Sequence, residues 1–309
     1  MPNWKELLDE VRTTGSTHDV LRRKYISNLS ALTGRNTIVY YSGWLQKADL
    51  VSYAFQGFSV EDGDKNGFMA AIHQLDRSKG LDLILHTPGG SVAATESLVD
   101  YLRAMFGTNI RAIVPQLAMS AGTMIALSCK EVLMGKHSSL GPIDPQFGGI
   151  PAHGVLEEFQ RAYEEITTKP ETIPVWQPVI AKYHPAFIGE CQKAVSWSKK
   201  MVRTWLETGM FQGSKQGPAK ASKIVDELGD HAVTLSHDRH YSAEAVKSLG
   251  VKVTMLEKKG QEDLQDAVLS LHHACIQTMS STGCYKLIEN QNGVTFALLL
   301  SMHQVSQGG

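Results

Sequence analysis

Two short stretches of the sequence contain residues whose types and positions suit acyl-transfer chemistry. Pro88-Gly89-Gly90 follows an apolar run, and Ser120 stands between a second apolar run and the small, apolar segment that begins at Ala121. Glycines let a turn adopt unusual dihedral angles, so its backbone N–H groups can bind an oxyanion closely. A serine at a helix start lies near unpaired amides and the positive end of the helix dipole, which stabilise negative charge. Together the two stretches predict a nucleophile beside an oxyanion-binding turn.

Each motif also has an ordinary structural interpretation. A Pro-Gly-Gly sequence is common in strand-to-helix turns, and a serine before a helix is common as an N-cap. The combination is more specific than either part. A glycine turn, one strand-helix-strand unit and then a helix-start serine would place both groups at carboxyl ends of neighbouring parallel strands. We therefore favour the catalytic interpretation over two unrelated turns.

Apolar patterning predicts the elements that would position these groups. Residues 81–85 and 110–115 are short, continuous apolar runs, as expected for strands buried on both faces of a parallel sheet. Apolar positions over 92–105 predict a helix between them, which Ser91 can cap. Residues 121–127 are small and apolar, which predicts a buried helix directly after the serine.

The segments HTPGGS, AMSAGTMIAL and LGPIDPQ together resemble the serine dehydrogenase proteinase family, within the fold group of Clp proteases, signal peptide peptidases and crotonases. The resemblance covers roughly residues 36–253. It implies an α/β fold of Clp-crotonase-like stacked βαβ units and a serine peptidase that hydrolyses peptide bonds. By this resemblance Ser120 is the nucleophile, and the amides of Gly89, Gly90 and Ala121 form the oxyanion hole.

The general base is less clear from the sequence. In Clp-type peptidases a histidine lies after the nucleophile helix, and the matching position here is Asp144, with His137 seven residues too early. Signal peptide peptidases use a Ser-Lys dyad instead, and a lysine needs desolvation to act as a neutral base near pH 7. Lys169 is favoured by resemblance, since its spacing from Ser120 and its place before a long helix are similar to those of the signal peptide peptidase lysine.

Other bases stay open. Lys182 and Lys193 are the further lysine candidates, and His237 is an alternative base that could instead hold a turn. For any one lysine, a solvated surface charge is the ordinary interpretation. Asp238, next to His237, is expected to cap or to form a salt bridge.

The composition is that of an ordinary globular protein. The 309 residues are 42% hydrophobic and 20% charged, with a formal net charge of -1, which gives no indication of nucleic-acid binding. The N-terminus lacks the apolar core of a secretion signal, and no apolar run reaches the roughly 18 residues of a membrane span. The four cysteines form no zinc pattern, and no metal, nucleotide or other cofactor is required. We expect a cytoplasmic protein with reduced thiols.

Three regions are expected. Residues 1–35 form an N-terminal helical segment with amphipathic helices at 4–11 and 17–32, residues 36–260 form the peptidase domain, and residues 261–309 form a C-terminal extension. The extension reads as a helix over 262–279 and a hairpin, with strands at 285–289 and 294–300 around Asn290-Gln291-Asn292-Gly293. Within the domain, 167–178 is a proline-broken excursion, and 180–208 is one long helix or a pair broken near Pro185. Members of the fold group usually assemble as rings, so the resemblance implies a homo-oligomer.

Two rival functions belong to other classes. A crotonase-like acyl-CoA enzyme would share the oxyanion hole but would need a CoA pocket and a carboxylate base. A non-catalytic Clp-like scaffold would keep the fold without a working base. A dehydrogenase is not supported, because no G-x-G-x-x-G sequence follows a strand.

Overall fold

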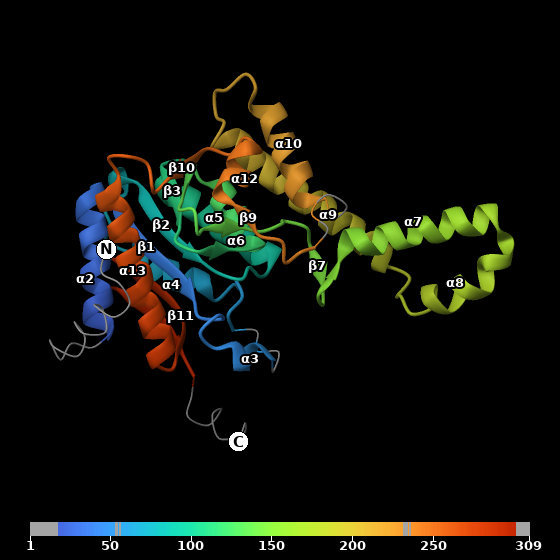
Figure 1. Ribbon diagram of the computed structural model, residues 1–309, viewed down its shortest axis with the longest axis horizontal. Coiled ribbons are helices and arrows are strands. Elements are labelled where there is room, and N and C mark those ends of the chain that lie inside the picture. The colour runs from blue at the N-terminus through green and yellow to red at the C-terminus, as the bar shows by residue number, and fades with distance from the viewer. Residues whose placement is uncertain (1–17, 53–54, 56, 231–233, 235, 301–309) are drawn as a thin grey trace.

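The computed structural model describes residues 18–52, 55, 57–230, 234 and 236–300. The helix expected over 4–11 lies outside these residues. Among the described residues, the chain forms an α/β body from which one helical arm projects (Figure 1).

A seven-stranded sheet runs through the body. Its five strands from β10 to β1 are parallel, β11 runs antiparallel to β1, and β12 runs antiparallel to β11. The strand order is β10 (Val253–Met255), β5 (Glu131–Met134), β3 (Ile110–Val114), β2 (Leu81–His86), β1 (Asn36–Ser42), β11 (Cys284–Asn290) and β12 (Thr295–Leu299).

The central strands are continuously apolar because helices cover both faces of the sheet. Side chains alternate between faces along a strand. In β1, Ile38 and Tyr40 pack in one hydrophobic cluster, whereas Val39 and Tyr41 pack in the other, and all four are fully buried. This arrangement is typical of parallel sheets, and it confirms the prediction made from the apolar runs.

The helices form a layer on each face. One layer contains α2 (His18–Thr33) and α13 (Glu262–Ser281), which pack on each other and on the Val39 face. The helices of the other layer pack on the face of the sheet that carries Tyr40. This layer consists of α4 (Asp64–Ile72), α5 (Val92–Phe106), α6 (Ala121–Ser128), α9 (Phe187–Thr208), α10 (Gly217–Gly229) and α12 (Ala243–Ser248). The fold is therefore the Clp-crotonase-like α/β fold that the sequence predicts.

The projecting arm consists of α7 (Ala152–Thr168), a 3-10 turn at Pro170–Thr172 and α8 (Ile173–Ile180) (Figure 1). The proline-broken excursion predicted over 167–178 lies at the tip of this arm: α7 ends just before Pro170, and the rest of the excursion is mostly helical. Pro174 occupies the first turn of α8, where a proline is tolerated, and Pro178 costs a short helix only one hydrogen bond. The predicted break near Pro185 is confirmed, since α8 ends at Ile180 and α9 begins at Phe187.

A small three-stranded sheet lies beside the main one. It consists of β4 (Leu117–Ala118), β6 (Ser139–Leu140) and β9 (Tyr241–Ser242). The pairing of β6 with β9 brings the loop after Leu140 next to the loop before Tyr241, although these loops are far apart in sequence. A hairpin of two short strands, β7 (Gln146–Phe147) and β8 (Ile150–Pro151), follows the first of these loops.

The C-terminal helix and hairpin are built into the sheet. The predicted hairpin is confirmed as β11 and β12, and β11 pairs along β1 from Ile38 with Asn290 to Ser42 with Lys286. The described helices include none that is both long and apolar enough to cross a bilayer. All four cysteines are buried and form no disulfide.

Candidate active site

The glycine turn joins the end of β2 to the start of α5. Gly89 and Gly90 have φ angles of 107° and 154°, which side-chain-bearing residues rarely adopt. The Val60 N–H donates to the Gly89 carbonyl at 2.7 Å, and the Ser91 N–H donates to the Val60 carbonyl at 2.9 Å. A Cβ on Gly90 would lie 2.3 Å from the Val60 nitrogen. The turn is thus held tightly against Val60, and Ser91 caps α5 by accepting from Ala94 N–H, as predicted.

Ser120 connects β4 to α6 with a strained backbone. Its φ of 49° and ψ of -113° are unusual for an L-residue, and such strain costs about 1–3 kcal/mol. The turn is fixed by a 2.7 Å hydrogen bond from Gly122 N–H to the Met119 carbonyl. The Ser120 side chain makes no capping hydrogen bond. The serine therefore lies at a helix start, but its hydroxyl does not cap the helix. It differs in this from an ordinary N-cap serine, which is the alternative interpretation of the sequence.

The glycine turn and the serine are in direct contact. A Cβ on Gly89 would lie 2.7 Å from the Ser120 Cβ and 3.2 Å from the Ala121 nitrogen. Ala121 is the first residue of α6, so its N–H has no acceptor within the helix. The Gly89 N–H donates weakly to Thr87 Oγ1 at 3.2 Å. The glycine turn and the first residue of α6 thus both lie against Ser120.

A pocket of about 500 Å³ opens over these groups. Its lining includes Gly89, Gly90 and Ser120 together with Asp144 and His237. The other lining residues come from the segment before α4, the glycine turn, α5, α6, the loop between β6 and β7, and the β7–β8 hairpin: Ser59, Pro88, Ser91, Val92, Met124, Ile143, Pro145, Gln146, Gly148 and Gly149.

His237 and Asp144 form an ion-pair geometry in this pocket. His237 Nδ1 lies 2.8 Å from Asp144 Oδ1, the Asp144 side chain is fully buried, and the His237 side chain is 20% exposed. A carboxylate accepts a hydrogen bond from Nδ1–H, which leaves the Nε2 lone pair available as a base. The loop that carries Asp144 is held by a 2.8 Å bond from Ile143 N–H to the Leu228 carbonyl. These contacts bring a histidine and a carboxylate to the pocket of Ser120.

None of the three predicted lysines is among the residues that line this pocket. Lys169 is exposed where α7 meets the 3-10 turn, in the projecting arm (Figure 1). Lys182 is exposed just after α8. Lys193 is 76% exposed on α9, where it pairs with Glu190 at 2.9 Å. The described residues of this chain therefore leave all three lysine side chains in contact with solvent and outside the pocket of Ser120.

The sequence predicts His237 as an alternative base and marks Asp144 as the residue at the position of the expected histidine, but it does not pair the two. Asp238, beside His237, is expected only to cap or to form a salt bridge. The signal that could have joined them is chemical: a Clp-like position with a carboxylate needs a histidine from elsewhere to complete a triad. The contact itself depends on the pairing of β6 with β9, two strands of two residues each.

A second groove of about 520 Å³ adjoins the first and shares Ser91, Val92, Pro145 and Gln146 with it. The remaining residues of this groove are Ala93, Phe147, Glu190, Lys193, Ala194 and Trp197. Its lining is largely apolar, and Trp197, which is 41% exposed, donates to Glu96 Oε1 at 3.2 Å. The two hollows therefore form one extended cleft along α5 and α9.

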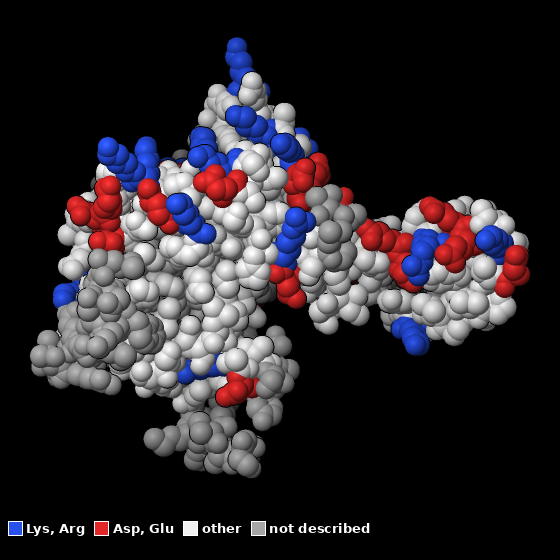
Figure 2. Space-filling view, in the orientation of Figure 1, with Lys and Arg blue, Asp and Glu red and all other residues white. Residues whose placement is uncertain are grey.

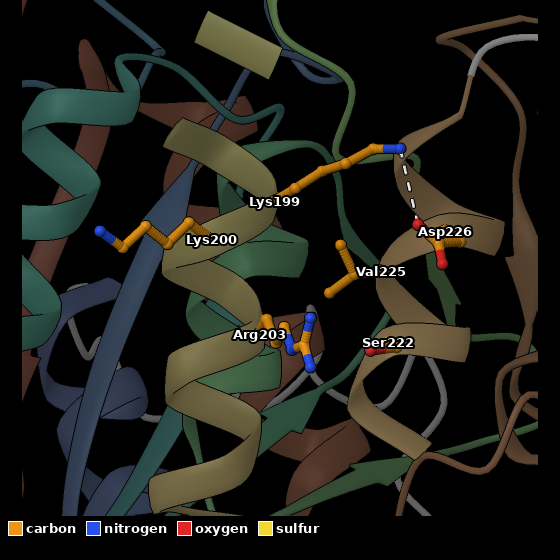
Figure 3. A pocket seen from close by; sticks show the side chains of 6 residues that line it. All are labelled: Lys199, Lys200, Arg203, Ser222, Val225 and Asp226. Atoms are coloured by element: carbon orange, nitrogen blue, oxygen red, sulfur yellow. Dashed lines mark ion pairs between the residues drawn. The ribbon is translucent and has the colours of Figure 1, made fainter. Parts of the chain in front are cut away.

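A separate basic hollow lies between α9 and α10 (Figure 3). Lys199, Lys200 and Arg203 of α9 line it, and Lys199 reaches across to Asp226 of α10 at 3.6 Å, whereas the Lys200 side chain points away from α10 (Figure 3). Figure 2 shows Lys and Arg side chains gathered over α10 and both signs of charge interspersed over the arm. This hollow contains neither Ser120 nor His237. Among the described residues, no group of three or more His, Cys, Asp or Glu is arranged to hold a metal ion.

The parallel sheet, the glycine turn and the helix-start serine place the molecule in the ClpP-like class of the Clp-crotonase fold group. The chain belongs to the family described as ClpP-like SDH-type serine proteinase, which matches residues 21–265.

Curated relatives and a solved structure are similar to the chain. Two uncharacterized proteins of Methanocaldococcus jannaschii are 29% and 30% identical to it over 212 and 199 residues. These matches cover 68% and 64% of this chain, and 64% and 61% of the relatives, so the chain spans less than two thirds of their length. A solved 1510-N membrane-bound stomatin-specific protease, in a mutant form, aligns with 15% identity and a TM-score of 0.38 over 67% of this chain and 79% of that one.

Proposed function

We propose that this protein is a serine peptidase in which Ser120 is the nucleophile, His237 the general base and Asp144 the carboxylate that orients the base. The observation that supports it most strongly is the pocket shared by Ser120 and His237, in which His237 lies 2.8 Å from the buried Asp144. Family membership supports the same class of reaction. The expected Ser-Lys dyad with Lys169 is the alternative, and the experiment below distinguishes the two.

In the acylation step, Ser120 Oγ forms a bond to the peptide carbonyl carbon while His237 Nε2 takes the hydroxyl proton. The carbonyl π electrons move to oxygen, and the resulting oxyanion is bound by backbone N–H groups of Gly89, Gly90 and Ala121. The C–N bond then breaks, and the leaving amine takes the proton from the imidazolium. The products are an acyl-Ser120 ester and the free amine fragment.

In the deacylation step, water attacks the ester carbonyl and gives its proton to His237 Nε2. The second oxyanion forms in the same hole, the C–Oγ bond breaks, and Ser120 recovers its proton from the imidazolium. Asp144 stays ionised in both steps and stabilises the imidazolium. Removing one donor of an oxyanion hole typically costs about 3 kcal/mol in the barrier.

A polypeptide substrate is supported by the shape of the cleft. The pocket of Ser120 continues into the apolar groove lined by Phe147 and Trp197, so residues on one side of the scissile bond can bind there. Peptide residues that lie away from the scissile bond can then bind the groove, and their binding energy can help to position the reacting carbonyl. We propose internal peptide bonds as the targets, since the cleft accommodates an extended chain.

The family resemblance also implies a homo-oligomer, which we keep as part of the proposal. Tyr163 and Val175 of the projecting arm are 67% and 68% exposed, and exposed apolar side chains often mark contacts between subunits. Sedimentation of wild type against a Tyr163→Asp, Val175→Asp variant tests this contact.

The central experiment measures cleavage of casein and of a terminally blocked fluorogenic peptide, together with fluorophosphonate labelling. In labelling, Ser120 Oγ bonds to phosphorus, fluoride leaves and the base takes the hydroxyl proton. The variants are Ser120→Ala, His237→Ala and Lys169→Ala. Ser59→Ala is the matched control, because Ser59 is another serine of the same pocket.

We expect Ser120→Ala to lose both activities and His237→Ala to lose more than about 10³-fold in kcat, as for other triad members. The kcat of Ser59→Ala and of Lys169→Ala should stay within about threefold of wild type, because neither side chain takes part in the proposed reaction steps. Loss in Lys169→Ala with an active His237→Ala would establish the dyad instead. A folded wild type that neither cleaves nor labels would favour the scaffold or an acyl-CoA enzyme.

A further inference from the structure

A buried lysine on the C-terminal hairpin has no role in the chemistry proposed above. The Lys286 side chain is fully buried on β11 and its ammonium donates to three acceptors. These are the Ser59 carbonyl at 2.7 Å, Asp64 Oδ1 at 2.9 Å and Glu61 Oε1 at 3.3 Å. A buried ammonium is tolerated only when it is paired and fully hydrogen-bonded, so the three acceptors must stay close to the Lys286 nitrogen.

The cluster fixes the segment from Phe58 to Glu61. Asp64 Oδ2 accepts from the Glu61 N–H at 3.0 Å, and the Ser42 hydroxyl donates to the Phe58 carbonyl at 2.8 Å. With the Lys286 bond to Ser59, three residues of this short segment are held by side chains of β1, α4 and β11. The segment is therefore a rigid support rather than a free loop.

Val60, at the centre of that segment, holds the glycine turn. It binds Gly89 and Ser91 through the two backbone hydrogen bonds described above, at 2.7 and 2.9 Å. It also forms a β-bridge with Gly90. The position of the two glycine amides relative to Ser120 therefore depends on where Val60 is placed.

A second route leads from the same carboxylate to the turn. The Tyr40 hydroxyl donates to Asp64 Oδ2 at 2.7 Å. Burial raises the pKa of Tyr40 well above its usual value, Asp64 adds to this rise, and a hydrogen bond with Thr87 opposes it. Thr87 Oγ1 in turn accepts from the Gly89 N–H at 3.2 Å. Both routes end at the glycine turn, which lies against Ser120.

We propose that Lys286 is a positioning residue for the oxyanion hole: its ion pair with Asp64 fixes Val60 and, through it, the amides of Gly89 and Gly90 next to Ser120. This inference rests on the proposed peptidase function. Lys286 lies beyond residues 21–265, which the family matches, so a segment outside the family region completes the site of this chain. A shift of about 1 Å in a catalytic group can cost about 100-fold in rate, which sets the scale of the effect.

The test measures the second-order rate of fluorophosphonate labelling and the kcat and KM for the blocked peptide, well below each variant's Tm. Lys286→Met removes the ammonium. Arg22→Met is its matched control, because the guanidinium of Arg22 forms an equally buried ion pair with Glu289 of the same strand, on the α2 side. Both variants lose stability, so Tm alone does not separate them.

A milder pair of variants keeps the core filled. Tyr40→Phe removes the hydroxyl that joins Asp64 to Thr87, and Tyr41→Phe removes the hydroxyl of the next residue, which contacts His272 Nδ1 at 3.0 Å on the other face. Both tyrosines are fully buried in β1. This pair decides the question if Lys286→Met does not fold.

We expect Lys286→Met to label about 10- to 100-fold more slowly and to lose kcat by a similar factor, with KM within about threefold, since the oxyanion forms only in the transition state. Tyr40→Phe should lose about 3- to 10-fold, and Arg22→Met and Tyr41→Phe should match wild type. Equal rates in Tyr40→Phe and Tyr41→Phe, or an equal loss in Lys286→Met and Arg22→Met, would overturn the inference. A wild type that does not label would reject the peptidase function itself.

Discussion

Replacement of Asp144 by asparagine tests the proposed catalytic pair most directly. Asp144→Asn keeps the shape of the side chain but removes the charge that faces His237 at 2.8 Å. The peptidase proposal requires that charge when His237 becomes an imidazolium. An asparagine can also donate to Nδ1, which would place the ring proton on Nε2, where the base must accept one.

The size of the effect follows from the geometry. Two unit charges 2.8 Å apart attract by about 6 kcal/mol at an effective dielectric constant of about 20. The His237 side chain is 20% exposed, and water screens part of this attraction, so we take about half of it. About 3 kcal/mol corresponds to a loss of roughly 150-fold in kcat.

The assay is kcat for the blocked peptide, with Tm measured for each variant. Asp82→Asn is the control, because Asp82 is equally buried but lies at the other end of β2, where it accepts from Arg35 at 2.7 Å and Arg111 at 2.6 Å. We expect Asp82→Asn to lose stability and keep its kcat. A kcat of Asp144→Asn within about fivefold of wild type would refute the argument. Such a small loss would mean that water screens the Asp144 charge almost completely, so that the carboxylate does not stabilise the imidazolium.

Three further outcomes are expected. Gly89→Ala should lose at least about 100-fold in kcat, because its methyl group would lie 2.7 Å from the Ser120 Cβ, whereas a KM effect alone would contradict the assigned hole. Trp197→Ala should raise KM for long peptides about fivefold and leave kcat unchanged, and an equal effect on a dipeptide ester would argue against the extended cleft. Burial, with help from His273 and His137, lowers the pKa of His272 from 6.5 to about 3. The unfolded state therefore binds this proton first as pH falls, so stability should fall by about 2 kcal/mol between pH 6.5 and 5, and urea unfolding of His272→Gln should show a smaller fall.

The central elements could be predicted from sequence because one physical constraint decides each of them. Strands covered on both faces must be apolar throughout, so the apolar runs at 81–85 and 110–115 predict two buried strands. Gly89 and Ser120 are also local features, since each depends on the backbone conformation of its own turn.

The pairing of His237 with Asp144, on which the proposed base depends, could not be predicted in the same way. His237 reaches the pocket through the pairing of Leu140 with Tyr241 and through the loop that carries Asp144, and neither two-residue strand leaves a periodic pattern. The spacing along the chain that favours Lys169 does not reveal that α7 leads away from the body into the arm (Figure 1).

The pairing of β1 with β11 has a consequence for the order of events during synthesis. Tyr40 lies opposite Ile288, so the neighbour of β1 on that side is made 248 residues later (288 minus 40). At a translation rate of about 5–20 residues per second, roughly 12–50 seconds separate the two strands. From the synthesis of residue 120 until that of residue 286, Ser120 has been made, while the ammonium that supports its glycine turn has not. By the role proposed for Lys286, the oxyanion hole of a nascent chain would reach its final position only when the last strands join the sheet.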